Sequence, residues 1–168
     1  LKDNQNSILL VLPSDHLIKD IKAFHDSIEI AIKQAEEGKL VTLGVTPTNA
    51  NTGYGYINFS KICIDGAYQV NKFIEKPNLE TAQAYLEDGN YLWNSGMFIF
   101  QANTLVKELT RHSPDIIKVA REAVICATQD LDFIRLKDHA LSSLPNNSLD
   151  CALMEKSKNI VTVLLDAD

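Results

Sequence analysis

Hydrophobic and polar positions in the first part of the chain predict a strand followed by a helix. Residues 7–12, SILLVL, form a short apolar run that stops at Pro13, which is typical of a parallel strand buried on both faces. We therefore expect this strand to be central in its sheet. Apolar residues then recur at helical spacing from Leu17 to Ala35, and Gly38 follows as a stop signal, which predicts an amphipathic helix.

A change of hydrophobic period after this helix predicts a mixed sheet. The apolar run LVTLGV at 40–45 predicts a second strand, which would complete a right-handed strand-helix-strand crossover and place the chain in the α/β class. Apolar residues then alternate with polar ones at 53–64 and 67–76, which are joined by an Asp-Gly turn at 65–66. This pattern predicts antiparallel or mixed strands linked by a tight turn.

The second half of the chain predicts more helices between two further strands. We expect a helix at 78–89, a strand at 91–100, mainly helical structure at 102–155 and a last strand at 159–166. Breaks in the helical part are expected at Ser113-Pro114 and at 144–148. Because strands lie so close to both ends, we expect residues 1–168 to be one incomplete domain of a larger protein.

Composition and charge narrow the classes of function. The chain has 168 residues, of which 45% are hydrophobic and 23% charged, and a net charge of −6 that leaves no broad basic face for nucleic acid. No apolar run approaches the roughly 20 residues that cross a bilayer. The three cysteines and four histidines have no metal-ligand spacing, so we expect reduced thiols in the core. These features favour a cytoplasmic protein that binds neither nucleic acid nor membrane.

The first candidate for chemistry is Asp15, which follows the first predicted strand. Ligands of parallel α/β sheets gather at the carboxyl ends of the strands, and a carboxylate there can hold Mg²⁺ beside a phosphate. The alternative is that Asp15 only caps the following helix or turn.

Two more segments place small and charged residues beside predicted strands. Gly53 and Gly55 in NTGYGYI would let a ligand approach the backbone, although glycines at a strand entrance also serve turns and bulges. Glu75 and Lys76 in FIEKP are expected to point to opposite faces at a strand end. Glu75 could accept hydrogen bonds from sugar hydroxyls and Lys76 could meet a phosphate, or the two could form a solvated charge pair.

The segment YLWNSGMFIF at 91–100 interrupts an apolar strand with Asn94, Ser95 and Gly96. An amide supplies both a donor and an acceptor, as recognition of a hydroxyl requires, and a glycine keeps the wall of a pocket thin. The alternative is a β-bulge in which Asn94 and Ser95 satisfy their own backbone.

Taken together and in order, LPSDH, TGYGYI, FIEKP and YLWNSGMFIF resemble the sugar-nucleotide pyrophosphorylases, most closely the bacterial mannose-1-phosphate guanylyltransferases. The resemblance covers nearly the whole chain, including SLDCALMEK near its end. It implies a Rossmann-like nucleotidyltransferase fold of the glycosyltransferase-A type, with a mixed sheet flanked by helices. It also implies synthesis of GDP-mannose and pyrophosphate from GTP and mannose 1-phosphate.

The resemblance also implies roles for single residues. Asp15 would be a catalytic Mg²⁺ ligand, and Lys76 would be a catalytic cation that meets the sugar phosphate. The residues that the resemblance assigns to sugar binding are Gly53, Tyr54, Glu75, Asn94 and Gly96.

Other readings of the resemblance stay open. The family's glycine-rich nucleotide loop and its second metal-binding aspartate are not found in residues 1–168, so the isolated chain is expected to be inactive. A pyrophosphorylase for another sugar, or a regulatory module that binds a sugar phosphate without catalysis, are the alternatives. Helix 102–111 could bury its apolar face internally or against a second copy in a homo-oligomer.

Overall fold

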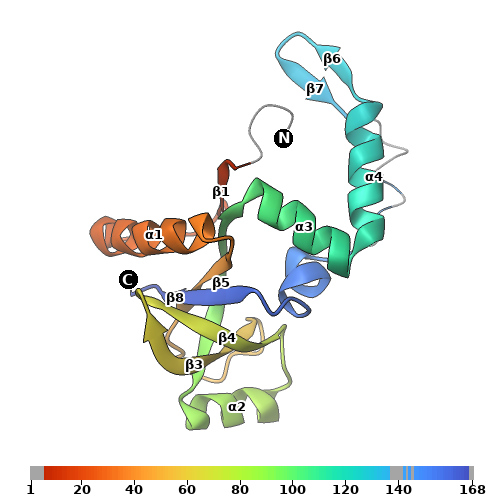
Figure 1. Ribbon diagram of the computed structural model, residues 1–168. Coiled ribbons are helices and arrows are strands. Elements are labelled where there is room, and N and C mark those ends of the chain that lie inside the picture. Colours follow the sequence, from red (N-terminus) through yellow and green to blue (C-terminus); the bar gives the residue numbers. More distant parts are fainter. Residues whose placement is uncertain (1–5, 137–141, 143, 145, 167–168) are drawn as a thin grey trace.

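The computed structural model describes residues 6–136, 142, 144 and 146–166, and its centre is one mixed sheet. The strands are β1 (Ile8–Val11), β2 (Leu40–Val45), β3 (Tyr56–Ile64), β4 (Ala67–Ile74), β5 (Tyr91–Gln101) and β8 (Ile160–Leu164). They pair in the order β1-β5-β2-β8-β4-β3, and β3 also pairs with β5. Figure 1 shows the sheet with its helices. Because β2 and β8 are parallel while the other pairs are antiparallel, the predicted mixed sheet is confirmed.

The predicted position of the first strand is wrong. Strand β1 pairs only with β5, antiparallel, and lies at one edge of the described sheet rather than at its centre. Its side chains from Leu9 on are exposed, with Leu10 at 44% and Val11 at 41%, whereas Ile8 is partly buried against the cluster under α1. A short apolar run shows that a strand packs against something, but it does not show how many neighbouring strands it has.

The predicted strand-helix-strand unit forms, but its two strands are not neighbours, because another strand lies between them in the sheet. Both β1 and β2 are antiparallel to β5, which lies between them, so β1 and β2 run parallel to each other. The connecting helix is α1 (Ile21–Glu36), which begins later than the sequence predicts. Asp20 caps it by accepting a hydrogen bond from the amide of Ala23 at 2.9 Å, and Leu17 stays outside the helix.

Helices cover both faces of the sheet and bury two apolar clusters. Alternate residues of β2 and β8 supply both clusters, because successive side chains of a strand point to opposite faces. Ala31 and Ala35 of α1 pack on one face against Val41 and Val163. On the other face Leu109 of α3 (Ala102–His112) packs with Phe100, Leu153 and Ile160. The sheet therefore lies between α1 and α3, as Figure 1 shows.

The other predicted helices are confirmed up to residue 125. Asn78 caps α2 (Leu79–Asp88) at its start, and Gly89 ends it in the left-handed conformation, φ 71°. After α3 the chain breaks at Ser113 and continues as α4 (Pro114–Ile125), with the proline in the first turn where it is tolerated.

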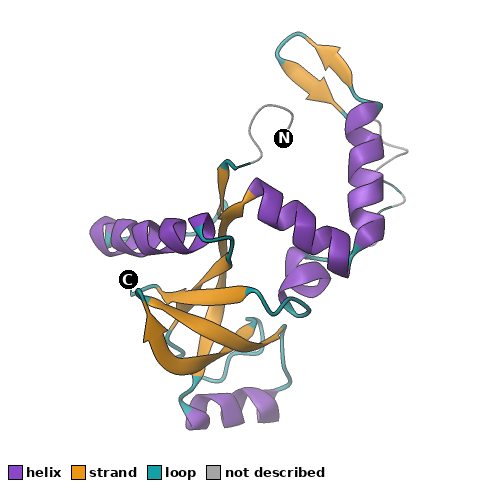
Figure 2. Ribbon diagram, viewed as in Figure 1, coloured by secondary structure: helices purple, strands orange, loops and turns teal. Residues whose placement is uncertain are grey.

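Helical structure was wrongly predicted for the segment after α4. This segment forms a small hairpin of β6 (Thr128–Asp130) and β7 (Phe133–Arg135), which Figure 2 shows extending away from the sheet. Leu131 turns the hairpin with φ 53°. A π-helical turn, η1 (Asp150–Met154), follows before β8. Predictions for 137–141, 143 and 145 lie outside the described residues.

The cysteines are free, but they are not all in the core. Cys63 and Cys126 are exposed and Cys151 is half-buried, so the expected reduced state agrees with the structure while the expected burial does not. Among the residues that the structure describes, no helix has both the length and the apolar content needed to cross a membrane.

Candidate functional site

A pocket of about 630 Å³ opens where the loops after several strands meet. Its lining consists of Pro13, Asp15, His16, Leu17, Ile18, Val45, Gly53, Tyr54, Gly55, Glu75, Trp93, Asn94, Ser95, Gly96, Met97, Asp150 and Leu165. Three of its walls follow the carboxyl ends of β1, β2 and β8, which run in the same direction. This is the edge at which the sequence predicted a ligand.

The pocket brings most of the predicted site residues together. Asp15, Gly53, Tyr54, Glu75, Asn94 and Gly96 all line it, although they come from four separate segments of the sequence. Lys76 is the exception, since it is not among the lining residues and its side chain is 63% exposed. Its ammonium nitrogen nevertheless lies only 3.7 Å from Oε1 of Glu75, at the margin of the pocket.

Ser95, Gly96 and Met97 form a bulge in β5 directly after Asn94, and all four residues line the pocket. Thr42 pairs with Phe98 and Gly44 pairs with Asn94, so three residues of β5 oppose the single Leu43. Ser95 Oγ donates to the carbonyl of Leu43 at 2.7 Å, and Gly96 takes the left-handed conformation with φ 73°. The segment is therefore a bulge and also lines the pocket, while recognition of a sugar hydroxyl by Asn94 stays a prediction.

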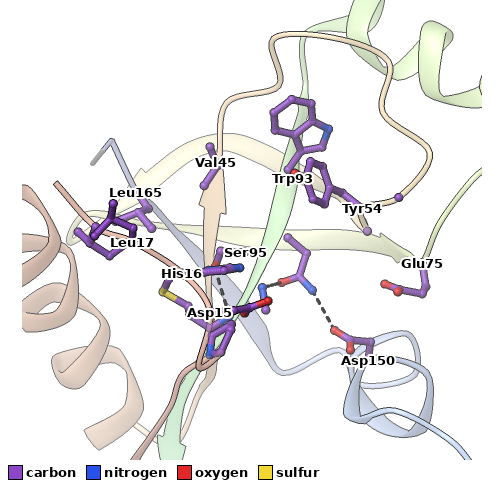
Figure 3. A pocket seen from close by; sticks show the side chains of 17 residues that line it. Asp15, His16, Leu17, Val45, Tyr54, Glu75, Trp93, Ser95, Asp150 and Leu165 are labelled. Carbon is purple, nitrogen blue, oxygen red and sulfur yellow. Dashed lines mark hydrogen bonds between the residues drawn. The ribbon is translucent and has the colours of Figure 1, made fainter. Parts of the chain in front are cut away.

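The side chain of Asn94 is already held by three hydrogen bonds. Its Oδ1 accepts from Thr42 Oγ at 2.9 Å and from the amide of Gly96 at 3.2 Å. Its Nδ2 donates to Asp150 Oδ1 at 2.9 Å, a bond drawn as a dashed line in Figure 3. The oxygen is therefore occupied, and within the described part of the chain one N–H remains for a ligand.

Asp150 is the main site residue that sequence reasoning missed. It lies in η1, 56 residues after Asn94, and Figure 3 shows its carboxylate on the same side of the pocket as that of Glu75. The segment SLDCALMEK belonged to the resemblance, but no pattern in the sequence indicates that η1 turns Asp150 towards β5.

The side chain of Glu75 lies close to the backbone of Gly55, and the backbone amide of Glu75 is hydrogen-bonded to Glu155. A Cβ atom at position 55 would lie only 2.7 Å from Glu75 Oε2, so the absence of a side chain makes room for the carboxylate. The backbone amide of Glu75 donates to Glu155 Oε1 at 3.2 Å. Burial raises the pKa of Glu75, as does the charge of Asp150, whereas Lys76 lowers it.

Lys76 has a strained backbone. Strand β4 ends at Ile74, and the chain bends at Glu75 and Lys76 before Pro77. Lys76 has φ 44°, in the left-handed region that a residue with a side chain rarely adopts, and proline disfavours a helical conformation before it. Such strain persists where the surroundings impose it, often at functional sites.

Two aromatic rings form the upper wall of the pocket in Figure 3. Tyr54 and Trp93 pack edge to face with their ring centres 5.1 Å apart, and Tyr54 is 47% exposed. They give the pocket an apolar surface opposite its carboxylates. This arrangement is complementary to a sugar, which has apolar C–H faces and polar hydroxyl edges.

Asp15 lines the pocket with an exposed carboxylate, and Asp20 rather than Asp15 caps the helix. Within the described residues, no group of three or more His, Cys, Asp or Glu side chains is placed to hold a metal ion. One carboxylate is a donor set that suits Mg²⁺ when phosphate oxygens and water supply the other ligands, because Mg²⁺ usually takes one or two protein ligands.

The fold and the pocket define an α/β protein with a ligand site where its strand-end loops converge. The family model described as nucleotidyl transferase matches residues 1–139, and the chain belongs to this family. The predicted fold class is thereby confirmed.

Individual relatives agree with this assignment. The mannose-1-phosphate guanylyltransferase of Escherichia coli is 44% identical over 167 residues, which cover 97% of this chain and 36% of the relative. Two crystal structures are also similar. A protein described as mannose-6-phosphate isomerase from Helicobacter pylori has a TM-score of 0.92 at 38% identity, over 99% of this chain and 66% of that one. A protein described as mannose-1-phosphate geranyltransferase from Thermus thermophilus has a TM-score of 0.84 at 32% identity, over 96% and 45%. The chain thus spans about a third of the length of the curated relative.

Proposed function

We propose that this chain supplies the sugar-phosphate site of an enzyme that makes GDP-mannose and pyrophosphate from GTP and mannose 1-phosphate. The observation that carries the proposal is that one pocket gathers Asp15, Gly53, Glu75 and Asn94 from separate motifs. The family match and the name of the Escherichia coli relative support the choice of reaction and sugar.

In this reaction an oxygen of the sugar phosphate attacks the α-phosphorus of GTP. The new phosphorus–oxygen bond forms as the bond to the β-phosphate breaks, and pyrophosphate leaves. The protein forms no covalent bond with the substrates in such a nucleotidyl transfer, so its main contribution is to position the two reactants.

The pocket residues account for binding and orientation of the sugar. Glu75 accepts hydrogen bonds from hydroxyls, and the remaining N–H of Asn94 donates one. Tyr54 covers an apolar face of the ring, and Lys76 at the margin faces the phosphate as a point charge.

Asp15 is the residue that we propose holds Mg²⁺, together with oxygens of the phosphates. The ion would neutralise negative charge on the phosphates. We propose the cytoplasm as the place of action, and supply of an activated sugar for polysaccharide synthesis as the role, because both proposed substrates are phosphorylated metabolites.

The test is to assay the full natural polypeptide for GDP-mannose formed from GTP and mannose 1-phosphate with Mg²⁺. Turnover is expected, and Asn94→Ala should weaken use of mannose 1-phosphate by about 1–3 kcal/mol, the cost of an unmatched polar contact. Asn71→Ala is the matched control, since Asn71 is exposed on β4, is not among the residues that line the pocket, and its side-chain amide donates to Asn58 Oδ1. Binding of mannose 1-phosphate without any product would instead identify a regulatory module.

A further inference from the structure

The charges that line the pocket are unusual for a site that receives a phosphorylated ligand. Its lining includes the carboxylates of Asp15, Glu75 and Asp150, but no lysine or arginine from the described residues. The cation at its margin is Lys76, which we have assigned to the sugar phosphate. The wall that contains Glu75 and Asp150 therefore offers hydrogen-bond acceptors, and the cation beside it is the exposed ammonium of Lys76, 3.7 Å from Glu75 Oε1.

Asp150 acts on this wall in two ways. It fixes the amide of Asn94, because Thr42 and the Gly96 amide occupy Oδ1 and leave Nδ2 to face Asp150. It also lies near enough to Glu75 for its charge to raise the pKa of that carboxyl. Both effects act on residues that line the same cavity.

We propose that Asp150 determines the specificity of this site, by orienting Asn94 and by making the wall with Glu75 select neutral sugar phosphates against sugar acids. This inference rests on the proposed function, since it concerns the sugar of the same reaction. Hydroxyls donate hydrogen bonds to both carboxylates. A ligand carboxylate on this wall meets two like charges in a partly buried place, where Coulomb repulsion is stronger than in water.

Two substitutions of Asp150 separate its two roles. Asp150→Asn removes the charge but keeps an oxygen that can accept from Asn94 Nδ2, whereas Asp150→Ala removes both. Asp65→Asn is the matched control, because Asp65 is exposed in the turn between β3 and β4 and does not line the pocket.

The experiment measures binding of mannose 1-phosphate and mannuronic acid 1-phosphate to the full natural polypeptide by calorimetry. We expect the wild type and Asp65→Asn to bind the neutral sugar at least about tenfold more tightly than the acid. Asp150→Asn should reduce this ratio by about tenfold, and Asp150→Ala should in addition weaken the neutral sugar by about tenfold through loss of the Asn94 anchor. Glu75→Gln should also reduce the ratio, which provides a second test if an Asp150 variant fails to fold.

Normal binding of mannose 1-phosphate with an unchanged ratio in Asp150→Asn and Glu75→Gln would overturn this inference and leave the proposed function standing. Equal affinity of the wild type for both ligands would also overturn this inference without affecting the proposed function. If the wild type bound neither ligand, the proposed function and the inference would both be overturned.

Discussion

Substitution of Gly55 by alanine tests whether the position of the Glu75 carboxylate matters for function. The added Cβ would lie 2.7 Å from Glu75 Oε2, 3.4 Å from Asn94 Cβ and 3.5 Å from the carbonyl oxygen of Ile74. Only the first contact is too short. Glu75 Oε2 is the end of a flexible side chain, so the carboxylate moves while the backbone stays in place.

The size of the effect follows from this displacement. Attractive contacts of carbon start at roughly 3.5 Å, so the carboxylate must retreat by about 0.8 Å. A ligand hydrogen bond of about 2.8 Å would then exceed 3.5 Å and be lost. Loss of that bond corresponds to about 1–3 kcal/mol of binding, or a rise in KM for the sugar phosphate of roughly 5- to 150-fold. The free energy of unfolding should change by less than about 1 kcal/mol, because no buried backbone moves.

Gly89→Ala is the matched control for Gly55→Ala. Gly89 ends α2 with φ 71°, and nothing lies within 4 Å of an added Cβ, so alanine there is strained by about 1 kcal/mol without any clash. Urea denaturation and steady-state kinetics should therefore separate the two variants, since Gly89→Ala loses stability and Gly55→Ala loses affinity for sugar. A folded Gly55→Ala variant with an unchanged KM would refute the role of Glu75.

Two further predictions concern the charged pair at the end of β4. The pKa of Glu75 is raised above 4.5 in the folded state, so this residue makes stability fall as the pH rises from 4.5 through the raised pKa. The free energy of unfolding, measured by urea denaturation at a series of pH values, should depend less on pH in this range for Glu75→Gln. An equal slope in the variant would contradict the raised pKa of Glu75. Lys76→Gly should relieve the left-handed backbone at φ 44° and keep or raise stability while it weakens binding of the sugar phosphate. Lys76→Ala should weaken binding equally without the gain in stability, and a loss of stability in Lys76→Gly alone would show that its backbone is not strained.

The sequence predicted those parts of the fold that depend on local signals. Helix ends and turns, such as Gly89 after α2 and Asp65-Gly66 between β3 and β4, depend on neighbouring atoms, so the sequence pattern is enough to place them. Which strands lie beside a given strand depends on contacts between residues that are far apart in the sequence. For this reason β1 was predicted in the centre, whereas the long strand β5 separates it from β2 and leaves it at an edge.

The same distinction applies to the site. Asp15, Glu75 and Asn94 each end or interrupt a strand, and the topology of the sheet brings these positions to one pocket. Asp150 was missed because its role depends on a contact with Asn94 over 56 residues of sequence. Glu75 and Lys76 were predicted to point to opposite faces, and the structure has Glu75 in the pocket lining and Lys76 exposed at the bend before Pro77. The contact of Lys76 with a phosphate stays a prediction.

The central claim is that one sugar phosphate contacts Glu75, Asn94 and the loop at 53–55 together. The most direct measurement is a titration of the ¹⁵N-labelled protein with mannose 1-phosphate, followed by the NMR signals of backbone amides and of the Asn94 side-chain amide. The account predicts that the Asn94 amide and the amides of residues 53–55 and 75 shift with one common dissociation constant, while those of β6 and β7 stay unchanged. Shifts confined to other surfaces, or an Asn94 signal that does not respond at saturation, would contradict it.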